Sequence, residues 1–380
     1  MTLHSQPRSP LLDHCPETLP QPAYLDADWY AREMRTIWAR NWVYAGRLHD
    51  LAAGTMRRVP VGAANAILCR DSAGGVTAFH NTCRHRGAEL CGPTEKPMGA
   101  LITCPYHAWS YGTDGRLVST AFATPTADFR RADHGLHPVQ VRVRNGFIFL
   151  CTASKPPALA RDGGLDVLDN WPMNGLVTGH VFETDLACNW KVFWENYNEC
   201  LHCPGIHPEL SDMVPIYRQG IMSAPEAVGW VPGGDPAPAL KDGAQSWTLT
   251  GAPCGPEFTG LTPDERRNGH NFVTIYPSIY IVAHVDYVRA VSLRPTGPET
   301  TRLRAEWLFL PETLAQPGFD AAEVAAFATT VMRQDGAACE MNQRGLRSPA
   351  YQRGRLMPQE FDIHRFHSWI LDQMTNGEPA

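Results

Sequence analysis

The sequence predicts an α+β protein made of two unlike parts, an all-β unit followed by a mixed unit of helices and antiparallel strands. Short strand-like runs separated by glycine-containing turns fill most of residues 42–151. Segments with helical spacing and four successive strand-like runs dominate the rest of the chain. Between them, Pro-Pro at 156–157 and Asp-Gly-Gly at 162–164 are typical of a boundary. We therefore expect an arm and helix over 1–41, a β unit over 42–157 and a mixed unit over 158–380, since 380 residues can form two domains.

The elements of the first part are predicted in order along the chain. Residues 1–22 form an irregular arm, and a helix follows from Asp26, which can cap it, to Asn41. The turn at 72–75 contains two glycines and joins two runs as a hairpin. Strands are expected at 42–45, 56–61, 66–70, 76–80, 102–103, 109–111, 139–144 and 147–151.

The second part mixes helices and strands. A helix is predicted over 189–201, because four aromatic residues between Trp190 and Tyr197 would share one buried face. Residues 220–265 are rich in Gly, Pro and polar groups, which indicates long loops. The remaining elements are strands at 271–276, 279–285, 287–293 and 302–310, and helices at 319–346 and 363–373.

Composition excludes several classes of protein. The net charge is −6 and no long basic run occurs, so we expect no nucleic-acid partner. No apolar run reaches the ~20 residues that span a bilayer. Residues 1–22 contain no apolar core of a signal peptide, so we expect no membrane association and a cytoplasmic location. The eleven cysteines are an odd number scattered along the chain, which favours a compartment that keeps thiols reduced.

Two short motifs in the β unit carry metal-ligand residues. Cys83 and His85 form a Cys-x-His motif, and Cys104 and His107 form a Cys-x-x-His motif about twenty residues later. Two Cys and two His suit a tetrahedral zinc site, although zinc motifs more often pair like residues in each half. Here each motif holds one Cys and one His, so each loop can give one ligand to each iron of a Rieske [2Fe–2S] cluster, in which two thiolates hold one iron and two imidazoles the other. The spacing favours the Rieske cluster over zinc.

A second set of ligand residues lies near the end of the helix predicted at 189–201. Glu199 and His202 are three residues apart and would share a helix face, and Pro204 and Gly205 break the helix so that His207 can return toward His202. Two imidazoles and one carboxylate form the facial triad of non-haem Fe(II) sites. The late helix offers two carboxylates for this role, Asp335 and Glu340, and His364 and His367 are weaker candidates by residue type.

The chain resembles the catalytic α subunits of Rieske non-haem iron oxygenases. The matching residues are the two Cys/His motifs, the Glu199-x-x-His202-x(4)-His207 segment, and Asp335 in the stretch 334–346, in the family's order over nearly the whole chain. The resemblance implies a Rieske β-domain and a helix-grip catalytic domain, in which an antiparallel sheet wraps a helix, and it assigns residues 1–41 to the catalytic domain. It also implies one [2Fe–2S] cluster and one mononuclear Fe(II), the latter held by His202, His207 and Asp335.

Dioxygen activation needs electrons that this chain must obtain elsewhere. No Gly-x-Gly-x-x-Gly loop for a nicotinamide cofactor occurs, so a separate NAD(P)H-dependent ferredoxin-type reductase is expected as a partner, besides O₂ and a small-molecule substrate. The resemblance implies a head-to-tail homotrimer, in which the cluster of one subunit faces the iron of the next across an acidic bridge. By position the bridge is Glu199, and the cluster histidine that faces it is His107.

The substrate class is suggested by Glu199, because Asp is the commoner bridge residue. A Glu there resembles the subgroup that acts on quaternary ammonium compounds, and glycine betaine demethylases are the nearest resemblance. The reaction implied is hydroxylation of an N-methyl carbon, after which the hemiaminal releases formaldehyde. Quaternary ammonium ions bind over aromatic rings, and a betaine carboxylate would bind an Arg or a His. The pocket candidates are Asn196, Tyr197, Cys203, Tyr276 and His284, with Arg289 as a further cation.

Three alternatives stay open at this point. An aromatic-ring hydroxylating or aromatic O-demethylating oxygenase would share the metal residues and differ only in its pocket. A Rieske electron carrier would explain Cys83 to His107 but leave the second ligand set without a role. A structural zinc protein would explain only the first motifs.

Overall fold

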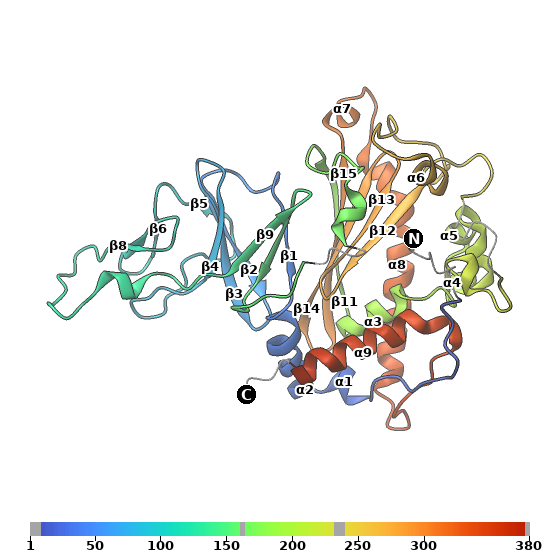
Figure 1. The fold of residues 1–380 in the computed structure, drawn as a ribbon, viewed down its shortest axis with the longest axis horizontal. Coiled ribbons are helices and arrows are strands. Elements are labelled where there is room, and N and C mark those ends of the chain that lie inside the picture. Colours follow the sequence, from blue (N-terminus) through green and yellow to red (C-terminus); the bar gives the residue numbers. More distant parts are fainter. Residues whose placement is uncertain (1–8, 160–163, 232–239, 377–380) are drawn as a thin grey trace, which may run out of the picture. The chain divides into compact units, whose positions relative to one another are not determined.

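The computed structural model describes residues 9–159, 164–231 and 240–376 (Figure 1). They divide into two compact units by their internal contacts. The first unit contains residues 33–159 and 275–278, and the second contains residues 9–32, 164–274 and 279–376.

The first unit is built of three small antiparallel sheets. One has the order β4-β3-β2-β5, and its hairpin partners β2 and β3 are in register from Thr55 opposite Arg70 to Val61 opposite Ala64. In the second sheet, β10 lies between β1 and β9 and is buried at every position, so both of its faces are covered. The strands are β1 (Val43–Arg47), β2 (Thr55–Val61), β3 (Ala64–Arg70), β4 (Val76–His80), β5 (Lys96–Pro97), β6 (Ile102–Thr103), β7 (Ser110–Tyr111), β8 (Leu117–Ser119), β9 (Gln140–Arg144) and β10 (Phe147–Cys151).

The second unit is centred on one five-stranded antiparallel sheet of order β11-β15-β14-β13-β12. Its strands are β11 (Val177–Leu186), β12 (His270–Ile275), β13 (Ile279–His284), β14 (Val288–Gly297) and β15 (Thr300–Phe309). The last four match the four predicted strands, whereas β11 was not predicted. At this edge strand half-buried and exposed residues alternate, as expected for a strand with one face toward solvent.

Helices complete the second unit. The longest, α8 (Ala321–Leu346), is capped by the Asp320 side chain and packs on β11 and on α3 (Trp190–Tyr197). A long helix against an antiparallel sheet agrees with the predicted α+β fold and its helix-grip unit. The other α-helices are α1 (Pro22–Leu25), α2 (Ala27–Glu33), α4 (Cys203–Ile206), α5 (Pro208–Met213), α6 (Pro263–Asn268), α7 (Pro311–Leu314) and α9 (Phe361–Asn376). None of the helices in the described residues is long and apolar enough to cross a membrane.

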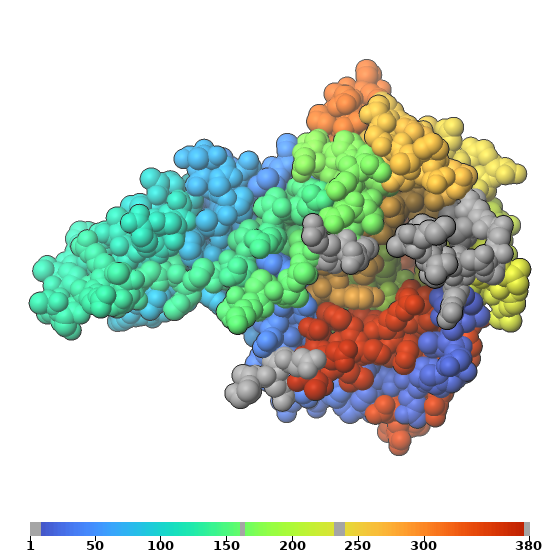
Figure 2. All heavy atoms as spheres, viewed as in Figure 1, coloured from blue at the N-terminus to red at the C-terminus, as the bar shows by residue number. Residues whose placement is uncertain are grey.

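The N-terminal arm of the described chain lies against the segment that precedes α9. The arm that precedes α1, in blue, lies beside the segment that leads into α9, in red (Figures 1 and 2). Backbone hydrogen bonds join Leu12 to Pro358 and Leu356 to Pro16. The predicted helix at 26–41 is present as α2 followed by a π-helical turn at Met34–Trp38. Residues 1–8 of the predicted arm lie outside the described residues.

Candidate metal centres and substrate cavity

The first two motifs occupy two loops of the first unit that share one backbone pattern. In the first loop the Gly87 N–H donates to the Cys83 carbonyl at 2.9 Å, and in the second the Ala108 N–H donates to the Cys104 carbonyl at 3.1 Å. Gly87 and Ala108 both have positive φ, 79° and 56°, which lets each loop turn back sharply. Each loop therefore holds its Cys at the base and its His near the tip.

Like residues from the two loops lie next to each other. The Cys83 and Cys104 side chains are buried, at 3% and 2% exposure, whereas His85 is exposed and His107 is half-buried. The two imidazole rings are 4.7 Å apart between centroids, and His85 stacks on Trp109 at the same separation. An inner pair of thiols and an outer pair of imidazoles suit a cluster with two different irons better than one tetrahedral ion.

Neighbouring side chains form hydrogen bonds with one residue of each pair and shift its pKa. The Tyr111 hydroxyl accepts from the Arg84 N–H at 3.0 Å and lies 3.1 Å from Cys83 Sγ, to which it can donate. Burial raises the pKa of Cys83, and the hydrogen bond from Tyr111 acts in the opposite direction. On the outer side the Arg86 guanidinium donates to His107 Nε2 at 2.8 Å. Partial desolvation and the Arg86 charge lower the pKa of His107, so its imidazole is held neutral, the form in which it can bind a metal.

The second ligand set follows α3, but its geometry differs from the predicted one. Helix α3 ends at Tyr197, four residues earlier than expected, so Glu199 and His202 do not share a helix face. Instead the Glu199 carboxylate folds back onto its own loop: Oε2 accepts from the N–H groups of Leu201 and His202, and Oε1 lies 2.5 Å from His202 Nδ1. The carboxylate thus fixes the loop and the ring together.

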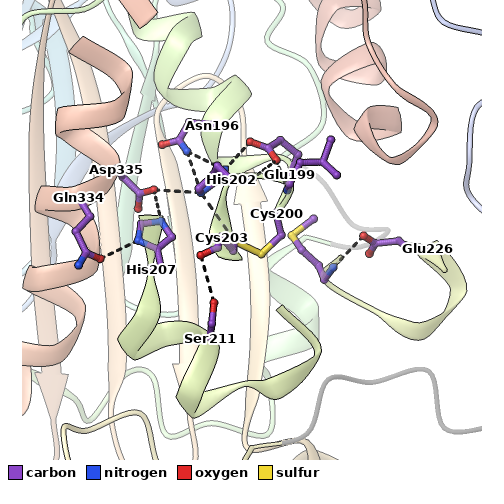
Figure 3. Close-up of a disulfide and its surroundings, with 12 residues drawn as sticks. Asn196, Glu199, Cys200, His202, Cys203, His207, Ser211, Glu226, Gln334 and Asp335 are labelled. Atoms are coloured by element: carbon purple, nitrogen blue, oxygen red, sulfur yellow. Dashed lines mark hydrogen bonds and ion pairs between the residues drawn. A yellow bond between two sulfur atoms is a disulfide. The ribbon is translucent and has the colours of Figure 1, made fainter. Parts of the chain in front are cut away.

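Three ligand atoms converge next to this loop (Figure 3). The ligand atoms of His202, His207 and Asp335 all lie within 4.8 Å of one another, the only such set of three in the described residues. His207 Nε2 lies 2.9 Å and His202 Nε2 3.5 Å from Asp335 Oδ1. The four Cys and His residues of the first unit do not converge in this way, which argues against a single zinc ion there.

Outer partners set the tautomers of the two imidazoles. His207 Nδ1 donates to Gln334 Oε1 at 2.8 Å and His202 Nδ1 to Glu199, which leaves both Nε2 atoms for a metal. Burial acts to raise the pKa of Asp335, but hydrogen bonds from His202 and His207 lower it below its ordinary value. Each Nε2 also faces Asp335, and although burial acts to lower the pKa of His202, its hydrogen bonds to Asp335 and Glu199 raise it to about 9. A divalent metal would take the place of the protons on the two Nε2 atoms, so the residues fit a metal held by two imidazoles and one ionised carboxylate.

The other candidate ligands lie apart from this point. Glu340 Oε1 accepts from the Ala187 N–H at 2.9 Å, and so serves to join α8 to the end of β11. His367 Nε2 lies 2.8 Å from Glu195 Oε1, and the His364 ring contacts His14. No sequence pattern points to Gln334 as a partner of His207, because its role depends on how α8 packs.

A disulfide encloses one of the ligands. Cys200 and Cys203 are joined, with Cα atoms 5.0 Å apart, and His202 lies within the four-residue ring (Figure 3). The scattered cysteines favoured a compartment that keeps thiols reduced, whereas in the structure this one pair forms a disulfide. The nine other cysteines in the described residues are free.

A cavity in the second unit has the three ligand residues in its wall. Of the predicted pocket residues, Asn196, Tyr197 and Cys203 line it, whereas Tyr276 and His284 do not. His284 is completely buried behind the cavity, with its ring 5.4 Å from that of Trp247. Six aromatic side chains line the cavity: Tyr197, Tyr217, Trp247, Phe272, Tyr280 and Phe327. Tyr217, Trp247 and Phe327 come from a 3₁₀ turn, a loop and α8, so no periodic pattern in the sequence identifies them together.

Comparison with known protein families agrees with both sites. Residues 41–130 match the Rieske [2Fe-2S] domain, and residues 173–376 match the ring hydroxylating alpha subunit (catalytic domain). The first match contains all four residues of the Cys/His motifs, and the second contains His202, His207 and Asp335.

Individual relatives cover nearly the whole chain. A glycine betaine monooxygenase oxygenase subunit of Chromohalobacter salexigens is 31% identical, covering 94% of this chain and 86% of its own length. A chloroplastic choline monooxygenase of Atriplex hortensis is 27% identical, covering 93% and 77%. A solved structure of a quaternary ammonium Rieske monooxygenase, described with carnitine oxidation by gut microbiota, has a TM-score of 0.72 at 21% identity over 95% of this chain and 96% of its own. This chain is therefore an enzyme of the Rieske oxygenase family, and it belongs there among the oxygenase subunits.

Proposed function

We propose that this chain hydroxylates an N-methyl group of a quaternary ammonium compound, most specifically glycine betaine, which would yield dimethylglycine and formaldehyde. The observation that carries the proposal is the cavity in which His202, His207 and Asp335 share a wall with six aromatic rings. Such rings bind onium groups, which cannot donate strong hydrogen bonds, through their negative faces. The named activities of the relatives, on glycine betaine and on choline, support this substrate class.

The proposed cofactors are one [2Fe–2S] cluster and one mononuclear Fe(II) per chain. Residues 42–157 would hold the cluster through Cys83, Cys104, His85 and His107, and residues 1–41 with 158–380 would hold the Fe(II). When bound, the Fe(II) activates O₂ and the cluster supplies an electron to it. The chain's own part is to keep both imidazoles of the triad in one tautomer, through Glu199 and Gln334.

The side chains around the triad position the substrate. The rings of Tyr197 and Tyr280 lie 4.1 Å apart between centroids, and both line the cavity. Burial raises the pKa of Tyr197 to about 12, so its phenol stays protonated and its ring uncharged at neutral pH. Neutral, electron-rich rings stabilise a cation that approaches the triad.

Glu199 is proposed as the bridge between subunits of a homotrimer. Together with His202 it lines a second cavity, bounded by α3, α8 and residues 351–363, as well as the substrate cavity. Each carboxylate oxygen has room for more than one hydrogen bond, so Glu199 can hold His202 and still accept from a histidine of a neighbouring subunit. A separate NAD(P)H-dependent reductase would reduce the cluster again after each electron transfer.

A single-turnover assay tests the proposal without the reductase. The protein is reduced chemically and mixed with O₂ and one of glycine betaine, carnitine, choline or vanillate, and formaldehyde is measured. We expect about three irons per chain, two from the cluster and one from the triad, and close to one formaldehyde per active site with glycine betaine. Formaldehyde from vanillate alone would replace the proposal with aromatic O-demethylation. A content of two irons and no product would indicate an electron carrier.

A further inference from the structure

One buried cation in the substrate cavity lacks an anion. Arg289 lies on β14, lines the cavity and is only 6% exposed. None of the ion pairs or hydrogen bonds found among the described residues involves its guanidinium, and its Nε has no partner. A buried charge without a counter-ion is unfavourable, so the protein keeps this arginine at a cost to its own stability.

Several polar side-chain atoms near Arg289 are also buried without a hydrogen-bond partner. Trp247 Nε1 is buried without a partner, as are both ring nitrogens of His284 and Nδ1 of His270. The His270 and His284 rings lie 5.0 and 5.4 Å from the Trp247 ring. Burial, followed by the Arg289 charge, lowers the pKa of His270 to about 4 and that of His284 well below its ordinary value. Of these residues only Arg289 and Trp247 line the cavity, so Arg289 is its cationic group and the histidines behind it are neutral.

The cavity wall contains groups of different charge. Arg289, Tyr280 and Asp335 all line it, and the charges of both Arg289 and Asp335 act on the Tyr280 phenol. A molecule that fills the cavity would thus meet a cation, neutral aromatic rings and the triad. A zwitterion with an anionic carboxylate and a methylated ammonium group matches this set of groups.

We propose that the Arg289 guanidinium binds the carboxylate of the substrate and thereby selects betaines over cations that lack an acid group, such as choline. This inference rests on the proposed function for the ammonium half of the ligand, whereas the anion half rests on Arg289 alone. Binding gives the buried charge a counter-ion. The names of the relatives include glycine betaine, which has a carboxylate, and choline, which has none. A carboxylate-binding Arg289 would place the present chain with the enzymes that act on betaines.

Equilibrium binding to the iron-loaded protein tests the anchor. Isothermal titration calorimetry with glycine betaine, choline and acetate would compare wild type with Arg289→Met, Arg289→Lys and Arg302→Gln. Arg302 is the matched control, because it lies on the neighbouring strand and is paired with Asp185 at the surface. We expect Arg289→Met to weaken glycine betaine binding by at least ~30-fold, to abolish acetate binding and to change choline binding less than ~3-fold. Arg289→Lys should recover part of the loss, and Arg302→Gln should bind like wild type.

The thermal midpoint of the ligand-free variants separates binding from a structural role. Because Arg289→Met removes an unpaired buried charge, its midpoint should equal or exceed that of wild type. A lower midpoint together with weaker binding, or unchanged glycine betaine affinity in Arg289→Met, would overturn the inference. If wild type binds acetate through Arg289 but none of the ammonium compounds, the anchor stands and the proposed demethylation fails.

Discussion

At the scale of single residues, Glu199 has the most demanding position. One of its oxygens holds the His202 ring and the other holds two backbone N–H groups of its own loop. The side chain is 11% exposed, so it is nearly buried yet reachable. We propose that Glu199 both fixes a metal ligand and carries electrons between subunits, and a substitution that keeps its shape can separate these two roles in an experiment.

Glu199→Gln should retain both metal centres and lose turnover. The amide oxygen can still accept from His202 Nδ1, whereas the amide nitrogen cannot accept from the backbone or from a partner's imidazolium. We expect iron content within ~10% of wild type and at least ~100-fold slower oxidation of the reduced cluster when O₂ and substrate are added. Stopped-flow absorbance of the cluster measures this rate. A wild-type rate in the variant would remove Glu199 from the electron path, and Glu340→Gln serves as the control carboxylate on α8.

Gln334 is predicted to control retention of the mononuclear metal. Gln334→Leu removes the acceptor for His207 Nδ1, so the ring can adopt the other tautomer or rotate. We expect Fe(II) affinity to fall by ~10–100-fold, with the cluster spectrum unchanged. Competition with a chelator of known affinity measures the dissociation constant of each variant for Fe(II). Glu209→Gln, which changes the far partner of the same Gln334 side chain, should have a much smaller effect.

At the scale of elements, the loop between α3 and α4 has a covalent constraint. The Cys200–Cys203 disulfide closes a four-residue ring around His202. Simultaneous replacement of both cysteines by serine should lower the free energy of unfolding by about 2 kcal/mol, the chain-entropy value for so short a ring. Urea unfolding of the metal-free protein measures the change, with Cys15→Ser as an exposed control. Equal stability of the double variant and wild type would show that the loop is held by Glu199 alone.

The elements also show what local sequence patterns can and cannot predict. The strands from 271 to 310 were predicted correctly because they alternate or are continuously apolar. The helix after Asn189 was extended too far, although its aromatic pattern itself ends at Tyr197. The side-chain-to-backbone bonds of Glu199 that replace the next helical turn have no sequence signature. Edge strand β11 was missed, because it contains Gly179 and charged residues that lower its strand propensity.

At the scale of the whole molecule, the candidate ligand residues were easier to predict than the cavity. Residue type and spacing pointed to His202 and His207, whereas the carboxylate stayed open between Asp335 and Glu340 until the family resemblance favoured Asp335. The cavity wall instead collects Tyr217, Trp247 and Phe327 from separate elements, and aromatic residues of the same kinds fill the core elsewhere. Only the tertiary arrangement shows which of them are free to contact a ligand.

The proposed trimer makes a prediction that concerns subunits together. Cys83→Ala removes the cluster and Asp335→Ala removes the mononuclear site, so each variant should be inactive alone. Co-expressed and isolated as mixed trimers, they should regain about a third of the wild-type activity if electrons cross between neighbours in a cyclic assembly, because one of the three interfaces then pairs an intact cluster with an intact mononuclear site. Purification through a tag on each variant and a formaldehyde assay test this. No recovery in confirmed mixed trimers would mean that electrons travel within one chain.

The cation at Arg289 has a consequence for the catalytic cycle. If it binds the substrate carboxylate as proposed, it would bind the part of glycine betaine that demethylation leaves unchanged, so dimethylglycine would present the same carboxylate. The product would then compete for the free enzyme and slow its own formation as it accumulates. Flux through the reaction would then depend on how fast the next enzyme consumes dimethylglycine, a form of feedback that needs no separate regulatory site.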